Sequence, residues 1–232
     1  MCHFTRGIGS RSFCVFLLLA PPALAQNKTP VVIELVLALD SSASVDAGEF
    51  QLQNEGIALA FRDPEVLQAF YNLRPFGAAI AIVQWGGPGE TQVVLPFTYI
   101  ENARDAKAFG FRASLVRRWM RASSTSIATG IADAHALIEK NAFEGQRKVI
   151  DVSGDGPDNS GGDLEAARKN ALASGITING LSIEAEESGL HDYYRERVII
   201  GADSFAEPAQ GFEDFARAMK EKLLRELRPL GS

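Results

Sequence analysis

After residue 26 the chain alternates between short apolar runs and longer stretches whose apolar residues recur every three or four positions. The apolar runs are typical of strands buried on both faces, and the spaced stretches are typical of helices that bury one side. This order predicts an α/β fold, doubly wound, in which a mostly parallel sheet carries helices on both faces. The expected strands are 31–39, 76–84, 91–100, 148–153 and 176–183, and the expected helices are 46–61, 102–119, 127–138, 162–174 and 212–227.

No Pro/Gly-rich linker, repeat or low-complexity tract divides this region, so we expect a single domain over residues 26–232. The whole chain has 232 residues and a net charge of −6. Two positive charges, Arg6 and Arg11, lie in residues 1–25 with no acidic residue, which leaves −8 on the rest. An acidic domain binds polyanions poorly, so we expect no nucleic-acid partner.

Residues 1–25 have the pattern of a cleavable secretory signal peptide. Two arginines precede the apolar run 13–20, and Ala23 and Ala25 supply the small residues of a cleavage site. We expect cleavage after Ala25. The run is far shorter than the ~20 apolar residues of a membrane span. The sequence therefore predicts a periplasmic or secreted protein with no stable membrane anchor after cleavage.

A set of oxygen-bearing side chains follows the predicted strands. Asp40, Ser42 and Ser44 occupy alternate positions directly after the first strand. Thr125 lies in the polar stretch that enters a helix, and Asp155 follows another strand. Ligands of open α/β sheets gather at the carboxyl ends of the strands, near the point where strand order reverses. We therefore expect these five side chains to converge at one edge of the sheet.

The chemistry of this set favours a hard cation. All five donors are oxygens, and both cysteines, Cys2 and Cys14, lie in the predicted signal peptide. The two histidines that remain, His135 and His191, have no metal-binding spacing. Such a set suits Mg²⁺, Mn²⁺ or Ca²⁺ and not zinc or copper. Three hydroxyls and two carboxylates leave a coordination position open, where a protein partner can offer an acidic side chain.

The same residues carry a resemblance to a known family. Asp40-x-Ser42-x-Ser44, Thr125 within Thr-Ser-Ile-Ala-Thr-Gly-Ile, and Asp155-Gly156 resemble the metal-ion-dependent adhesion site (MIDAS) of the von Willebrand factor A (VWA) domain. The similarity covers about residues 31–228. Within the superfamily the chain is most similar to an exported bacterial group of unknown function, through residues 149–156 and 205–209.

The resemblance implies a six-stranded sheet with one antiparallel edge strand. It also implies that a divalent ion binds to Asp40, Ser42, Ser44, Thr125 and Asp155 and is completed by a carboxylate from another molecule. These are expectations for the structure.

Three further polar residues are candidates for supporting roles. Asp151 interrupts a strand that should be apolar, so it needs a partner or a raised pKa. A structural hydrogen bond to a helix start is the favoured interpretation, and the alternative is an acid that supports the ion from behind its direct ligands. Asp158 and Asn159 can reach the ion through water, although turning the chain and capping the helix near Asp163 is favoured.

The two tryptophans and two histidines carry weaker signals. Trp85 ends a predicted strand, and Trp119 precedes the Thr125 stretch. Core packing is the favoured interpretation for both tryptophans, since large aromatic side chains are mostly buried, and an apolar rim for a partner is the alternative. For His135 and His191 we expect surface or hydrogen-bonded positions.

Three functions are compatible with these patterns. The leading one is a metal-dependent protein-binding module, used in adhesion or as a scaffold. A metal-assisted hydrolase of phosphate or carboxylic esters is the second, because the same ion can polarise a phosphoryl or ester group. The motifs place no obvious general base, and a nucleophile elbow and a phosphate-binding loop are both lacking. The third is a scaffold that has the fold and leaves the site vacant.

Overall fold

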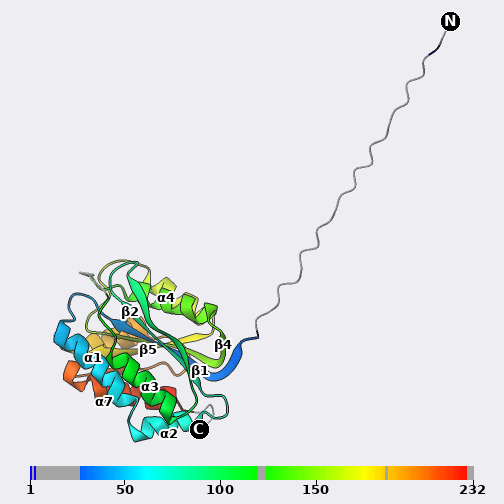
Figure 1. Ribbon diagram of the computed structural model, residues 1–232. Helices are drawn as coiled ribbons and strands as arrows, with labels where there is room; N and C mark the ends of the chain where they lie inside the picture. Colours follow the sequence, from blue (N-terminus) through cyan, green and yellow to red (C-terminus); the bar gives the residue numbers. More distant parts are fainter. Residues whose placement is uncertain (2, 4–26, 120–123, 186–187, 229–232) are drawn as a thin grey trace.

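Six strands form one sheet in the computed structural model, which describes residues 1, 3, 27–119, 124–185 and 188–228 (Figure 1). The strand order is β3-β2-β1-β4-β5-β6. Every neighbouring pair is parallel except β2 and β3, which pair antiparallel at one edge. The strands are β1 (Thr29–Asp40), β2 (Ala78–Trp85), β3 (Thr91–Ile100), β4 (Phe143–Gly154), β5 (Ile176–Ile183) and β6 (Ala206–Ala209).

Helices cover both faces of this sheet, as the alternation predicts. One face carries α1 (Ala47–Ala60), α2 (Pro64–Asn72), α3 (Ala103–Ser114), the 3₁₀ turn η2 (Phe212–Asp214) and α7 (Phe215–Glu226), which Figure 1 shows grouped together. The other face carries α4 (Ile127–Lys140), α5 (Leu164–Ala173), α6 (Leu190–Tyr193) and the π-helical turn η1 (Tyr194–Val198).

The central strand β1 separates two apolar cores. Leu35, Leu37 and Leu39 pack into the core beneath α1, α3 and α7, while Val36 and Ala38 face the core beneath α4. Successive side chains of a strand point to opposite faces, so a strand covered on both sides must be apolar at nearly every position. The expected α/β fold with a mostly parallel six-stranded sheet and one antiparallel edge strand is confirmed.

The predicted helix over 102–119 is too long. Its helical part, α3, ends at Ser114, and the chain then runs irregularly to Trp119. Buried polar side chains form hydrogen bonds with the backbone of this irregular part. Asn54 Nδ2 donates to Val116 O at 3.0 Å, and Gln84 bonds to the backbone of Arg117 and Trp119. These bonds replace the helical pattern, which explains the early end.

The expectation for Asp151 needs correction. Its carboxylate is fully buried and pairs with Lys222 Nζ at 2.9 Å, in the middle of α7 and not at a helix start. Lys222 Nζ also donates to Gly180 O at 3.0 Å and lies 3.7 Å from Glu226 Oε1. Burial raises the pKa of Asp151 although Lys222 opposes the shift. The helix is thus attached to β4 by a buried ion pair.

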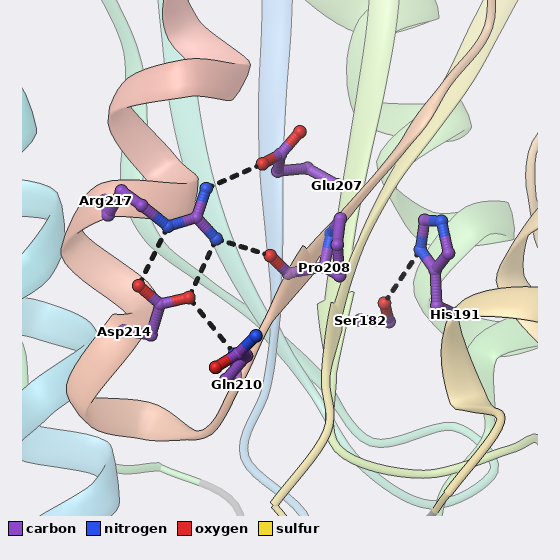
Figure 2. A network of polar contacts seen from close by, with 7 residues as sticks. All are labelled: Ser182, His191, Glu207, Pro208, Gln210, Asp214 and Arg217. Carbon is purple, nitrogen blue, oxygen red and sulfur yellow. Dashed lines mark hydrogen bonds and ion pairs between the residues drawn. The ribbon is translucent and has the colours of Figure 1, made fainter.

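The start of α7 is attached to β6 by a second, more exposed network (Figure 2). Arg217 donates to Glu207 Oε1 at 2.8 Å and to Pro208 O at 2.6 Å. Its guanidinium also binds both carboxylate oxygens of Asp214, at 2.8 and 2.7 Å, and Asp214 accepts from Gln210 N. Hydrogen bonds from Arg217 hold the pKa of Asp214 below its usual range.

The predicted signal peptide and its cleavage site fall almost entirely outside the described residues. Within the described residues, no helix combines the length and the apolar character that crossing a membrane requires.

Candidate metal centre

The candidate centre lies where strand order reverses. Within the sheet, β2 lies next to β1 on one side and β4 lies next to β1 on the other. The loops after β1 and β4 therefore flank a topological switch point. Asp40 is the last residue of β1 and lies opposite Trp85. The loop that follows ends at Asp46, which caps α1 through a reciprocal capping box with Glu49.

The structure brings all five predicted side chains together. Ser42 Oγ lies 3.1 Å from Ser44 Oγ and 3.4 Å from Thr125 Oγ1. Ser44 Oγ donates to Asp155 Oδ1 at 2.9 Å, and Asp40 Oδ1 accepts from Ser42 N at 2.8 Å. Three loops that are distant in the sequence therefore place their oxygens within contact distance of one another.

The five side chains of this cluster differ in their exposure to solvent. Asp40, Ser42 and Thr125 are buried, Asp155 is half-buried and Ser44 is exposed. A pocket of about 230 Å³ is lined by Ser44, Thr125 and Asp155 and by Glu49, Gly156, Pro157, Asn159 and Ala185. Because a water occupies about 30 Å³ in the liquid, the pocket has room for an ion with several waters or for a carboxylate from outside.

Asp40 provides the test of whether a cation fits. Its Oδ2 is buried and has no hydrogen-bond partner among the described residues. Burial, and then the charge of Asp155, raise the pKa of Asp40 to about 7, against hydrogen bonds from Ser42 that lower it. A buried carboxylate without a full set of partners is costly unless a cation or proton neutralises it. The residues therefore fit a hard divalent ion.

The composition of the cluster explains which ions it suits. No group of three or more His, Cys, Asp and Glu side chains in the described part of the chain is arranged to hold a metal. The candidate centre instead combines two carboxylates with three hydroxyls, and such oxygens are ligands for Mg²⁺, Mn²⁺ or Ca²⁺. Glu49 is the other carboxylate on the pocket wall, and it accepts from Asp46 N at 2.7 Å in the capping box.

Asn159 and Asp158 hold the Thr125 loop. Asn159 Oδ1 accepts from Thr125 N at 2.9 Å, and Asn159 N donates to Thr125 O at 3.0 Å. Asp158 Oδ1 lies 3.5 Å from Ala128 N in the first turn of α4, and burial raises its pKa. The predicted capping of the helix near Asp163 is therefore wrong for Asp158 and Asn159, because Asp163 itself caps α5. Asp158 instead lies at the start of α4, whose N-cap is Ser126.

Sequence reasoning missed the residues that support the loop after β1. Arg118 donates to the carbonyl oxygens of Ser41 and Ser42, and Gln53 Nε2 lies 3.4 Å from Asp40 O. Gln84 Nε2 donates to Arg117 O at 2.9 Å, which fixes the segment that carries Arg118. No spacing signal in the sequence points to these side-chain-to-backbone bonds.

The remaining candidates are not in the cluster. Trp85 is fully buried, as expected, but Trp119 is largely exposed, so core packing is wrong for Trp119. Its backbone N donates to a buried glutamine, which holds it at the surface. His135 Nε2 lies 2.9 Å from Ser174 Oγ, and His191 Nδ1 lies 3.4 Å from Ser182 Oγ (Figure 2).

Comparison with known proteins gives a family and a fold. The family model described as "Protein of unknown function (DUF1194)" matches residues 30–230. Comparison with the curated proteins finds no significant match.

Solved structures with the same fold include VWA domains. Proximal thread matrix protein 1 from the mussel byssus, with a zinc-occupied MIDAS motif, matches at a TM-score of 0.62 and 14% identity over 86% of this chain and 48% of its own. The pilus adhesin SpaC from Lactobacillus rhamnosus GG matches at 0.60 and 14% over 87% and 30%. The vWF domain of the type V pili tip protein Mfa5 from Porphyromonas gingivalis matches at 0.59 and 11% over 87% and 98%.

At these low sequence identities, the structural similarity establishes the fold and not the function. The chain spans about half the length of the mussel protein and less than a third of the pilus adhesin. It has the fold of a VWA domain.

Proposed function

The chain belongs to this family of unknown function, and we propose that it is a divalent-metal-dependent protein-binding module that acts outside the cytoplasm. The observation that carries the proposal is the convergence of Asp40, Ser42, Ser44, Thr125 and Asp155, with distances of 2.9 to 3.4 Å between the side chains of the last four. The unpartnered Oδ2 of buried Asp40 supports a cation there.

In this proposal the hydroxyls of Ser42, Ser44 and Thr125 hold Mg²⁺, Mn²⁺ or Ca²⁺ with Asp40 and Asp155. A hard ion bound by neutral hydroxyls and two carboxylates retains affinity for a further oxygen ligand. The exposed side of the cluster, at Ser44, opens into the pocket, so an acidic side chain of a protein partner can complete the coordination.

The predicted export supports this assignment. The predicted signal peptide over residues 1–25 would deliver the mature chain to the periplasm or the medium. Among the proteins of the same fold, one is a pilus adhesin and one a pilus tip protein. By analogy of fold, we place this chain in an adhesive or scaffolding role.

Isothermal titration of the purified chain with Mg²⁺ and Mn²⁺ tests the proposal. We expect binding by the native chain and a loss of affinity of about tenfold or more in Asp40→Asn, which removes a charge without changing the shape of the side chain. Asp133→Asn, on the exposed surface of α4, is the matched control and should bind as the native chain does. No binding by the native chain, or equal binding by Asp40→Asn, would contradict the proposal.

Metal binding should also stabilise the fold. At a Mg²⁺ concentration about 100 times Kd, binding to the folded state alone contributes about 2.7 kcal/mol. For a domain of this size that corresponds to a rise of about 5–10 °C in the melting temperature, reversed by chelator. An unchanged melting temperature is the result that a vacant scaffold predicts. Metal-dependent hydrolysis of phosphate or carboxylic esters that Asp155→Ala abolishes would favour the hydrolase instead.

A further inference from the structure

Three large apolar side chains lie exposed on the stretch that leads from α3 toward the metal centre. Phe111 is 54% exposed in the last turn of α3, Leu115 is 64% exposed just after it, and Trp119 is 65% exposed four residues further on. We call Phe111, Leu115 and Trp119 the apolar rim. More than half of the surface of each side chain stays in water, so folding gains little from them.

The backbone of this stretch is nevertheless held firmly. Asn54 Nδ2 donates to Val116 O at 3.0 Å. Gln84 Nε2 donates to Arg117 O at 2.9 Å, and Gln84 Oε1 accepts from Trp119 N at 2.8 Å. Asn54 and Gln84 are both buried, so they are polar groups in the interior that hold an irregular surface segment in place. A fixed backbone with exposed aromatic and aliphatic side chains is typical of a preorganised contact surface.

The rim ends beside the metal centre. Arg118, the residue before Trp119, donates to the carbonyl oxygens of Ser41 and Ser42. Ser42 is one of the five candidate ligands, and its hydroxyl contacts two others. Trp119 thus directly follows a residue that is bonded to the loop carrying a candidate ligand.

The charge of the stretch indicates what kind of partner fits. Arg117 is exposed and Arg118 half-buried, and neither forms an ion pair with any residue that the structure describes. The chain as a whole carries a net charge of −6. Arg118 is engaged with the backbone of Ser41 and Ser42, whereas the exposed guanidinium of Arg117 is available to a carboxylate from outside. Two positive charges on this stretch favour an acidic partner, and arginine and tryptophan are residue types enriched at binding hot spots.

We propose that the apolar rim is the second half of the partner-binding surface, and that it selects an acidic segment of a partner protein. In that segment the carboxylate that reaches the ion is accompanied, a few residues away, by an aromatic or long aliphatic side chain that packs on Trp119 and Leu115. This inference rests on the proposed metal-dependent binding, and it adds the property that distinguishes the right acidic partner from any other acidic chain.

Selection from a random-peptide phage library in the presence of Mg²⁺ tests the inference. The baits are the native chain, Trp119→Ser, and Leu172→Ser as the control, since Leu172 is exposed to 44% on α5, on the other face of the sheet. We expect the native chain and the control to enrich peptides with an Asp or Glu and a neighbouring apolar residue. Trp119→Ser should enrich acidic peptides without the apolar preference.

A synthetic copy of an enriched peptide then gives the affinity. We expect its binding to Trp119→Ser to be about tenfold weaker or more, as for the loss of a hot-spot aromatic residue. The emission of Trp119 in the native chain should shift to the blue as the peptide covers it, whereas Trp85 is already buried.

The outcomes separate the two proposals. Acidic peptides enriched by the native chain without an apolar preference, or bound equally by Trp119→Ser, would overturn the role of the rim and leave metal-dependent binding standing. Failure of the native chain to enrich any Mg²⁺-dependent acidic peptide would overturn both. Self-association of the native chain that Trp119→Ser abolishes would identify a second copy, not a partner segment, as the occupant of the rim.

Discussion

At the scale of single residues, the two glycines beside Asp155 differ sharply in their surroundings. A Cβ on Gly154 would lie 2.7 Å from the hydroxyl of Tyr194 and 3.1 Å from Asp40 Oδ2. A Cβ on Gly156 would meet no atom within 4 Å. The end of β4 therefore lies very close to the buried carboxylate of Asp40. Any side chain at position 154 would displace that carboxylate or the hydroxyl of Tyr194, so glycine is required there.

Gly154→Ala should disturb both stability and the metal centre. The added methyl must displace Tyr194 or Asp40, which are both buried, and overpacking of this kind costs about 1–3 kcal/mol. We expect a weaker Mg²⁺ affinity as well, because Asp40 moves. Gly156→Ala is the control, with a change within about 0.5 kcal/mol. Urea unfolding and calorimetric titration measure the two effects, and equal stability of the two variants would show that the close approach has no cost.

The five oxygen-bearing side chains were predictable and their supports were not. Asp40, Ser42 and Ser44 follow a strand at alternate positions, so the strand pattern alone locates them at the carboxyl edge. Arg118 and Gln84 act by bonds to backbone atoms of other segments. Every residue type has a backbone carbonyl oxygen, so a bond to that oxygen does not require a particular residue at the acceptor position. Such bonds therefore cannot be predicted from the residue types in the sequence.

At the scale of elements, α7 is attached to the sheet through buried charges. Glu226 in its last turn is buried and accepts from Asn179 Nδ2 of β5 at 3.0 Å. Three charged residues also act on Glu226: Asp151 and Arg147 of β4 and Lys222 of its own helix. Burial, and then the charge of Asp151, raise the pKa of Glu226 to about 7. The folded protein thus holds this proton more tightly than the unfolded chain does.

This raised pKa predicts a loss of stability as the pH rises. Above about pH 4.5 the unfolded chain releases the Glu226 proton while the folded protein keeps it, so stability falls until about pH 7 and the contribution is constant above that. Glu226→Gln should reduce this slope, and Glu221→Gln, exposed on the same helix, should leave it unchanged. Urea unfolding between pH 4 and 8 provides the measurement. A slope in Glu226→Gln equal to that of the native chain would contradict the assignment.

Elements that bury most of their residues were predicted well, and elements that bury few residues or are very short were not. The strand over 176–183 has the predicted ends, because its first and last residues, Ile176 and Ile183, are the outermost apolar side chains of a segment that is buried almost throughout. By contrast, α2 was missed, since its nine residues expose most of their surface and bury only Val66 and Phe70. The four-residue strand β6 was also not placed, because so few residues show no period.

At the scale of the whole molecule, the alternation of strands and helices determines most of the arrangement. Parallel strands joined by helices have right-handed crossovers, and this rule leaves few possible sheet orders. The carboxyl edge then collects the loops after β1 and β4 and the start of α4, which is why residues as distant as Ser44 and Asp155 meet. The position of the apolar rim did not follow from this rule, since it depends on where α3 ends.

The predicted export gives a test on the whole chain. Expressed in a bacterial host, the protein recovered outside the cytoplasm should begin at Gln26, as intact mass and N-terminal sequencing would show. Ala25→Phe should block processing, because the cleavage site requires a small residue there, and Gln26→Ala should be processed normally. Unprocessed chain that stays in the cytoplasm would contradict the predicted signal peptide.

The position of β1 has a consequence for how such a chain could cross a membrane. Its first residue, Thr29, follows shortly after the predicted cleavage site, yet β1 lies between β2 and β4, and β4 ends only at Gly154. A polypeptide threaded through a translocation channel with its N-terminus leading delivers the middle of the sheet first and the neighbour that completes it much later. Parallel pairings distant in sequence form slowly. Well over half of the polypeptide thus emerges before β1 can pair with both of its neighbours. The rest of the chain therefore stays unfolded while it passes through the channel.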